Sequence, residues 1–179
     1  MKTDIRFTHQ SLVEQCKSGN PSSQYELYAL YVDAMFNVGI RFLGNKEDAE
    51  DIVQDSFIDA FKKLHSFKYE SSFGAWLKRI VINKSINHLK AKRIPVVPME
   101  PHEFHLTDEE PIEAEAVDLK KVQLGLKKLP EGYRQILTLY LIEGYDHVEI
   151  AEILDISSST SKSQYHRAKK KLLEIITSL

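Results

Sequence analysis

Hydrophobic residues recur along most of this chain at the three- and four-residue spacing that places them on one face of a helix. The alternation typical of strands is scarce, and glycine and proline are few. The pattern therefore predicts an all-α fold. A long helix should run from Pro21 to Gly44, and the next from Lys46 to Leu64. Further helices are expected at 9–18, 72–92, 112–129, 133–142, 147–154 and 158–177.

Polar residues mark where several of these helices begin. Asn20 followed by Pro21 is typical of an N-cap and a first helical turn. Asp146, with Glu149 three residues later, forms a capping-box pattern. One of the two serines at 71–72 should cap the helix that follows them.

Prolines interrupt the helical pattern between two groups of helices, at Pro95, Pro98, Pro101 and Pro111. From 100 to 118 there are eight acidic residues and no Lys or Arg. This composition is typical of a segment with little structure. We therefore expect two small helical domains, at 1–93 and 112–179, joined by a flexible acidic linker at 94–111.

The charges are segregated along the chain, which the net charge of −2 over 179 residues conceals. Residues 71–99 carry six Lys and Arg and no acid, and residues 158–173 carry five and no acid. Basic blocks of this kind are typical of surfaces that bind nucleic acid.

An acidic block lies before them, with six acids and no Lys or Arg at 47–59. Acidic groups do not attract DNA, so a function for this block needs a protein partner with a basic surface. Asp51, Gln54 and Asp55 fall within one helical turn and are candidates for a docking patch. A solvated acidic face is the alternative.

Cys16 is the only cysteine, which excludes a disulfide framework and indicates a reducing compartment. No apolar run approaches the ~18 residues of a membrane span, and the first residues lack the apolar core of a signal peptide. The expected location is the cytoplasm, without membrane insertion.

The segment 146–173 has the form of a helix, a tight turn and a longer basic helix, which predicts a helix-turn-helix unit that reads the major groove of DNA. At ~100° per residue, the last helix has two faces. The inward face should hold Tyr165, Ala168, Leu172, Ile175 and Ile176. The opposite face holds the candidate DNA-binding residues Lys162, Ser163, His166, Arg167 and Lys170. A solvated basic face is the alternative, but the capped helix and turn before it favour DNA binding.

A second candidate DNA surface involves the loop at 65–70 and the helix after it. Its candidate residues for single-stranded DNA are Phe67, Trp76, Arg79 and Asn83. Unpaired bases stack on aromatic rings for ~1–3 kcal/mol each, and an Asn can read the edge of a flipped base. Alternatively, Phe67 and Trp76 belong to the core.

Together these segments resemble an extracytoplasmic-function RNA polymerase sigma factor of the sigma-70 family, over nearly the whole chain. DAEDIVQDSF at 48–57 resembles the family's polymerase-docking helix, and SSFGAWLKRIVIN at 71–83 resembles its −10 recognition segment. The start of its −35 domain is matched at Leu129, Pro130, Arg134, Glu143, Gly144 and EIA at 149–151. STSKS at 159–163, with Arg167 and Ala168, resembles its recognition helix. The order and spacing of these segments make the resemblance specific.

The resemblance implies a promoter-specificity factor that directs transcription initiation. Asp51, Gln54 and Asp55 would dock on the β′ subunit of bacterial core RNA polymerase. Asn83 and the loop around Phe67 would capture an unpaired −10 base, and the last helix would read the −35 duplex. The β subunit and promoter DNA are further implied partners, and the family commonly works with an anti-sigma factor. The recognition helix departs from the usual pattern at Ser159, Ser161, Gln164 and Tyr165, which affects the −35 sequence rather than the fold.

Three other classes of function are alternatives. A helix-turn-helix regulator that binds duplex DNA without polymerase would favour palindromic sites, and two unlike DNA surfaces argue against it. An interaction module without DNA contact would be insensitive to charge reversal at Arg167. For an enzyme, the sequence offers no nucleophile–base pair, no catalytic residue and no cofactor motif. His102 and His105 in a Pro-rich segment are a poor metal site.

Overall fold

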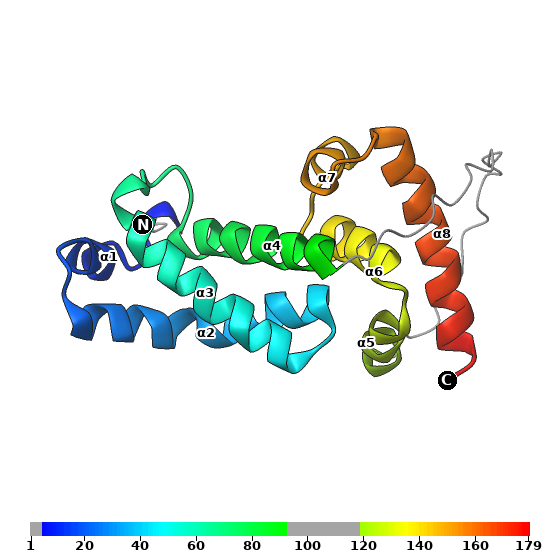
Figure 1. The fold of residues 1–179 in the computed structure, drawn as a ribbon, viewed down its shortest axis with the longest axis horizontal. Coiled ribbons are helices and arrows are strands. Elements are labelled where there is room, and N and C mark those ends of the chain that lie inside the picture. The colour runs from blue at the N-terminus through cyan, green and yellow to red at the C-terminus, as the bar shows by residue number, and fades with distance from the viewer. Residues whose placement is uncertain (1–4, 93–118) are drawn as a thin grey trace. The chain divides into compact units, whose positions relative to one another are not determined.

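The computed structural model describes residues 5–92 and 119–179, and all the regular elements in these ranges are helical (Figure 1). The predicted all-α class is confirmed. The chain divides into two compact units, residues 1–92 and 93–179. The predicted linker at 94–111, the expected helix start at 112, and His102 and His105 lie outside the described residues.

Three long helices form the body of the first unit, with shorter elements before and between them. The elements are η1 (Ile5–Phe7), α1 (Gln10–Lys17), α2 (Pro21–Leu43), α3 (Lys46–Lys63), η2 (Leu64–Ser66) and α4 (Phe73–Lys92). α2, α3 and α4 pack against one another, and α1 packs on α2. The connection between α3 and α4 lies at the same end of this unit as α1 (Figure 1).

Local polar signals determine where these helices begin and end. Asn20 Oδ1 accepts hydrogen bonds from Ser22 N and Ser23 N, as predicted for the cap of α2. Gly44 ends α2 in the left-handed conformation, with φ of 69°. At α4, Ser72 is the cap, since its Oγ accepts from Ala75 N at 3.2 Å.

The core of the first unit is built from the apolar stripes of these helices. Its fully buried side chains include Leu27, Phe42, Leu64, Phe73 and Leu77. Burial of each such side chain is worth about 1.5–3 kcal/mol, so these residues of α2, η2 and α4 contribute to the stability of the first unit.

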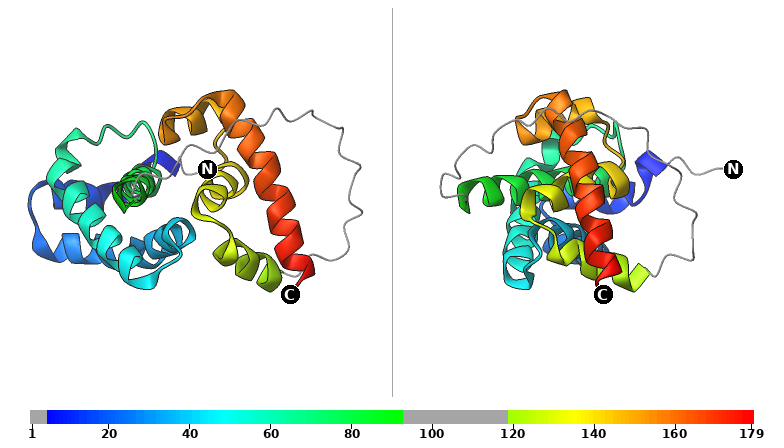
Figure 2. Two further views of the ribbon diagram at one scale, coloured as in Figure 1. Left: turned by 45° about the vertical axis from the view of Figure 1, so that its right-hand side comes forward. Right: turned by 90° about the vertical axis from the view of Figure 1, so that its right-hand side faces the viewer.

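The second unit is a smaller group of helices around a long last helix. The elements are α5 (Leu119–Lys128), α6 (Glu131–Leu137), the π-helical turn η3 (Thr138–Ile142), α7 (His147–Leu154) and α8 (Ser158–Thr177). α5, α6 and α7 all pack against α8 (Figure 2). The predicted inward face of α8 is confirmed: Ala168 is in the core with Leu129 and Leu137, and Tyr165, Leu172 and Ile175 pack against it.

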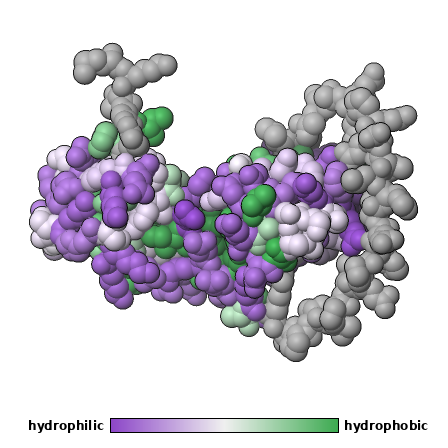
Figure 3. All heavy atoms as spheres, turned by 90° about the horizontal axis from the view of Figure 1, so that it is seen from above, coloured by the Kyte–Doolittle hydropathy of each residue, from purple (hydrophilic) through white to green (hydrophobic). Residues whose placement is uncertain are grey.

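The surface is mostly hydrophilic in the view from above, with separate hydrophobic patches (Figure 3). None of the described helices combines the length and the apolar composition needed to cross a membrane.

Candidate nucleic-acid interface

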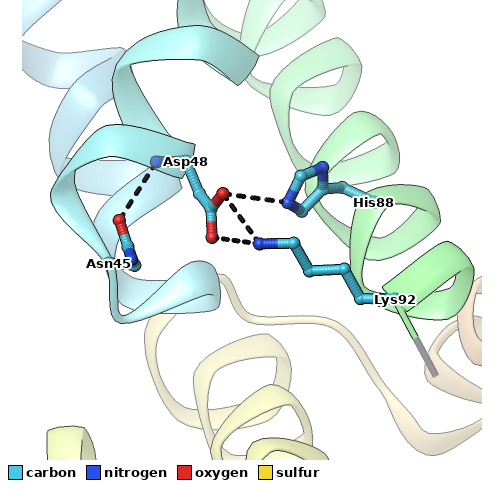
Figure 4. Close-up of polar contacts among 4 residues, drawn as sticks. All are labelled: Asn45, Asp48, His88 and Lys92. Carbon is cyan, nitrogen blue, oxygen red and sulfur yellow. Dashed lines mark hydrogen bonds and ion pairs between the residues drawn. The ribbon is translucent and has the colours of Figure 1, made fainter. Parts of the chain in front are cut away.

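The carboxylates of α3 divide into a paired set and an unpaired set. Asp48 accepts hydrogen bonds from Lys92 Nζ at 2.8 and 2.6 Å, and His88 Nε2 lies 3.3 Å from the same carboxylate (Figure 4). Asp59 Oδ2 lies 2.9 Å from Lys84 Nζ. The hydrogen bonds from these two lysines lower the pKa of Asp48 and of Asp59. Both carboxylates therefore tie α3 to α4.

The unpaired set contains the predicted docking patch. Asp51, Gln54 and Asp55 are exposed, and their spacing of three and four residues places them on one face of α3. None of the three side chains forms a hydrogen bond or an ion pair with another residue in the described part of the chain. They therefore form a polar, acidic patch that is free to meet a partner.

The exposed face of α4 carries part of the predicted −10 surface. Arg79 and Asn83 are exposed and one turn apart. Trp76, three residues before Arg79, is half-buried, with its ring centroid 5.2 Å from that of Phe67 and 5.9 Å from that of Phe73. This face therefore offers a cation, an amide and the uncovered part of an indole.

Phe67 does not belong to that exposed face. Its side chain is 4% exposed and its ring centroid lies 4.7 Å from that of Tyr69 and 6.1 Å from that of Phe73. Its N–H donates to Leu64 O, which folds the chain back after η2 and turns the ring into the core. In this conformation Phe67 therefore occupies the core, as in the alternative expectation, and its ring supports the loop from within.

The helix-turn-helix unit has the predicted capping box and turn, and a further cap at Ser157. Asp146 Oδ1 accepts from Val148 N and Glu149 N, and Glu149 Oε2 accepts from Asp146 N at 2.9 Å, which completes the capping box. Asp155 adopts the left-handed conformation in the turn. Ser157 Oγ then caps α8 by accepting from Thr160 N. These bonds set the start of α8.

The polar face of α8 is accessible along its length. Lys162, Ser163 and Lys170 are exposed, and His166 and Arg167 are half-buried. The Ser163 hydroxyl donates to Ser159 O at 3.0 Å, so it would have to exchange this bond to donate to a phosphate or a base, but its oxygen can still accept from a base amino group. The structure thus brings all five predicted residues to one side of one helix.

A polar and aromatic cluster lies beneath this face, and sequence reasoning missed it. Ser161 is fully buried, and its Oγ lies 2.9 Å from His147 Nδ1. The His147 ring stacks on Tyr140 with centroids 4.6 Å apart. Burial, followed by the charges of Lys162 and His166, lowers the pKa of His147. The available signal was Ser161 itself, a polar residue at an inward helical position that needed a buried partner.

Comparison with known proteins matches each of the two units to a protein family. The family described as Sigma-70 region 2 matches residues 27–94, and the family described as Sigma-70, region 4 matches residues 119–172. The chain is 30% identical to the ECF RNA polymerase sigma factor SigW of Bacillus subtilis, over 89% of this chain and 92% of that protein. It is 32% identical to the RNA polymerase sigma-H factor of Pseudomonas aeruginosa, over 90% of each.

Solved structures agree in fold. The sigma factor RpoE from Bartonella quintana, solved with the anti-sigma factor NepR, is 25% identical, with a TM-score of 0.55 over 86% of this chain and 96% of that one. CnrH, solved with the cytosolic domain of CnrY, is also 25% identical, with a TM-score of 0.53 over 98% of this chain and 99% of that one. These relatives do not favour a regulator that acts without polymerase.

Proposed function

The chain belongs to the extracytoplasmic-function sigma factors of the sigma-70 family, and on this premise we propose which of its surfaces perform each step of promoter recognition. An RNA polymerase sigma factor must bind the core enzyme and contact two promoter elements. In our proposal the docking patch of Asp51, Gln54 and Asp55 binds the β′ subunit of core polymerase. The exposed face of α4 meets the −10 element, and the polar face of α8 meets the −35 element.

The observation that carries this assignment is the position of the surfaces relative to the family matches. The docking patch and the α4 face both lie within residues 27–94, and the polar face of α8 lies within residues 119–172. The domains would accordingly be 1–93 and 112–179, with 94–111 as the linker. Unpaired acids on α3 support protein docking, since paired acids such as Asp48 already serve the fold.

At the −10 element, we propose that Asn83 reads an unpaired base and that Arg79 contacts the DNA backbone. The uncovered part of the Trp76 ring would be available for stacking. At the −35 element, Lys162, His166, Arg167 and Lys170 would contact base edges and phosphates in the major groove. The protein would act in the cytoplasm without enzymatic activity of its own. The anti-sigma complexes of its structural neighbours support an anti-sigma factor as a further partner.

Titration of the labelled chain against bacterial core RNA polymerase tests the docking patch. The wild type should bind, and the double variant Asp51→Arg/Asp55→Arg should lose most of this affinity. A control with the same charge change, Glu26→Arg/Asp33→Arg, alters two exposed acids on α2 and should bind like the wild type.

Each other result of the titration has a definite meaning. Wild-type affinity in both double variants would place the docking surface elsewhere on the chain. Equal loss in both would indicate a response to net charge rather than to the patch. Failure of the wild type to bind would contradict the proposed docking on core polymerase.

A further inference from the structure

Tyr69, in the loop between η2 and α4, has an unusual backbone conformation. Its φ is 59°, in the left-handed region that bulky residues rarely adopt. Such a conformation persists only where the surroundings enforce it, and it is often found at functional sites.

The enforcing contacts come from α1, more than 50 residues earlier in the chain. Tyr69 Oη donates to Glu14 Oε1 at 2.7 Å, and Lys17 Nζ donates to the same carboxylate at 2.9 Å. Lys17 Nζ also donates to Phe67 O at 3.3 Å and lies 4.7 Å from the centroid of the Tyr69 ring. The rings of Phe67 and Phe7 flank Tyr69, with centroids 4.7 and 5.8 Å away.

These groups are in the right protonation states for the arrangement. Burial and the bond to Glu14 raise the pKa of Tyr69, which keeps its hydroxyl a donor. The hydrogen bond from Tyr69, together with that from Lys17, lowers the pKa of Glu14, which keeps it an acceptor. Only 18% of the Lys17 side chain is exposed, so its charge acts on this loop rather than on solvent.

The loop leads directly to the α4 face. Phe67, whose carbonyl Lys17 holds, supports the ring of Trp76 at 5.2 Å. Trp76 precedes Arg79 and Asn83 on the same face. A change in the shape of the loop would therefore move the surface against which a base held by Asn83 must fit.

We propose that Glu14 and Lys17 form a clasp that fixes the loop 67–72 through Tyr69 and thereby sets base discrimination at the −10 element. The inference rests on the proposed role of the α4 face. Glu14 and Lys17 act as positioning residues and do not touch DNA. They belong to α1, which precedes the residues 27–94 matched by the region 2 family.

The test uses holoenzyme reconstituted from the full chain and bacterial core RNA polymerase. The probe is a DNA bubble whose unpaired non-template segment is randomised, and selection identifies the most discriminated base. The measured quantity is the ratio of Kd values for the preferred and the substituted base. Kd for core polymerase and the thermal unfolding midpoint are recorded for every variant.

Tyr69→Phe keeps the ring and removes the donor, and Glu14→Ala removes the acceptor. Both should reduce the discrimination ratio by at most about tenfold, the factor that one hydrogen bond to a charged group is worth, because the Glu14 side chain is 51% exposed. Core affinity should be unchanged. Glu14→Gln should retain most of the discrimination, since its amide oxygen still accepts from Tyr69. The control Glu174→Ala removes an i,i+3 pair with Lys171 of the same 2.9 Å length on α8 and should change nothing.

Asn83→Ala separates the two proposals. A base preference that Asn83→Ala abolishes and both clasp variants retain would overturn the clasp alone. The absence of any preference in the wild type would overturn the −10 role of α4 and the clasp with it. Loss of core binding together with discrimination in Tyr69→Phe would overturn the clasp in favour of a general structural role.

Discussion

At the scale of single residues, Ser161 and His147 show how one buried polar side chain constrains another. Ser161 has no exposed surface, and its hydroxyl can satisfy its bonding capacity through His147 Nδ1. A buried hydroxyl without a partner costs about 1–3 kcal/mol, so the pair is favourable only while the imidazole keeps its place. Stacking on Tyr140 holds it there.

From this pair we predict that the stability of the second unit falls at acidic pH because His147 becomes protonated. Burial, then Lys162 and His166, lowers the folded pKa below its ordinary value of 6.5, with Asp146 opposing them. The unfolded chain then binds the proton more readily than the folded chain. The stability contributed by neutral His147 is therefore fully present above about pH 6.5 and is lost as the pH falls through the lower folded pKa.

Thermal unfolding of the full chain and of His147→Gln, followed by circular dichroism from about pH 7.5 to pH 5, checks this prediction. The midpoint of the wild type should fall more steeply towards acid than that of the variant. Parallel curves would show that His147 does not titrate differently in the folded and unfolded states.

At the scale of elements, helix ends were predictable and cross-helix partners were not. The ends at Asn20, Gly44 and Asp146 depend on bonds within three or four residues, which a single sequence displays directly. The burial of Phe67 and the bond between Tyr69 and Glu14 depend on packing across tens of residues. The predicted inward face of α8 was correct because one helical period decides it.

The α3–α4 ion pairs should each contribute little to stability, because they are partly exposed. The Lys92–Asp48 side chains are 54% and 23% exposed, and those of Lys84–Asp59 are 27% and 33% exposed. We expect Lys92→Ala to lower the free energy of unfolding by about 0.2–1 kcal/mol. Lys84→Ala should also lower it slightly. Urea denaturation measures this, with Lys46→Ala as a control in a more exposed pair at 3.5 Å. A loss of several kcal/mol would mean that these pairs fix the helix angle itself.

The polar face of α8 allows binding to phosphates to be separated from binding to base edges. Holoenzyme binding to a selected promoter fragment should weaken in Lys162→Ala and in Arg167→Ala. A variant that no longer binds one phosphate should show a slope of log K against log salt that is shallower by ~0.9, whereas a variant that no longer binds a base edge keeps the slope of the wild type. Lys171→Ala, whose side chain is paired with Glu174, is the control. Unchanged affinity in both variants would show that neither side chain touches the promoter.

At the scale of the whole molecule, the candidate DNA-binding surfaces are divided between two units, which limits the ability of the chain to open DNA without core polymerase. Each unit has its own core and its own exposed polar face, so under the proposed function binding energy is spread over separate elements of DNA. Neither face contains a large aromatic platform, since Phe67 is buried and Trp76 is half-buried.

We therefore expect that this chain does not open promoter DNA without core polymerase. Melting ~10 base pairs at ~1.4 kcal/mol each costs about 14 kcal/mol. Stacking recovers only ~1–3 kcal/mol per base, and the half-buried Trp76 offers room for few bases. Permanganate footprinting of unpaired thymines should show no reactivity with the isolated chain and clear reactivity once core polymerase is added. Reactivity with the chain alone would require an additional source of about 10 kcal/mol, which the exposed side chains of α4 do not provide.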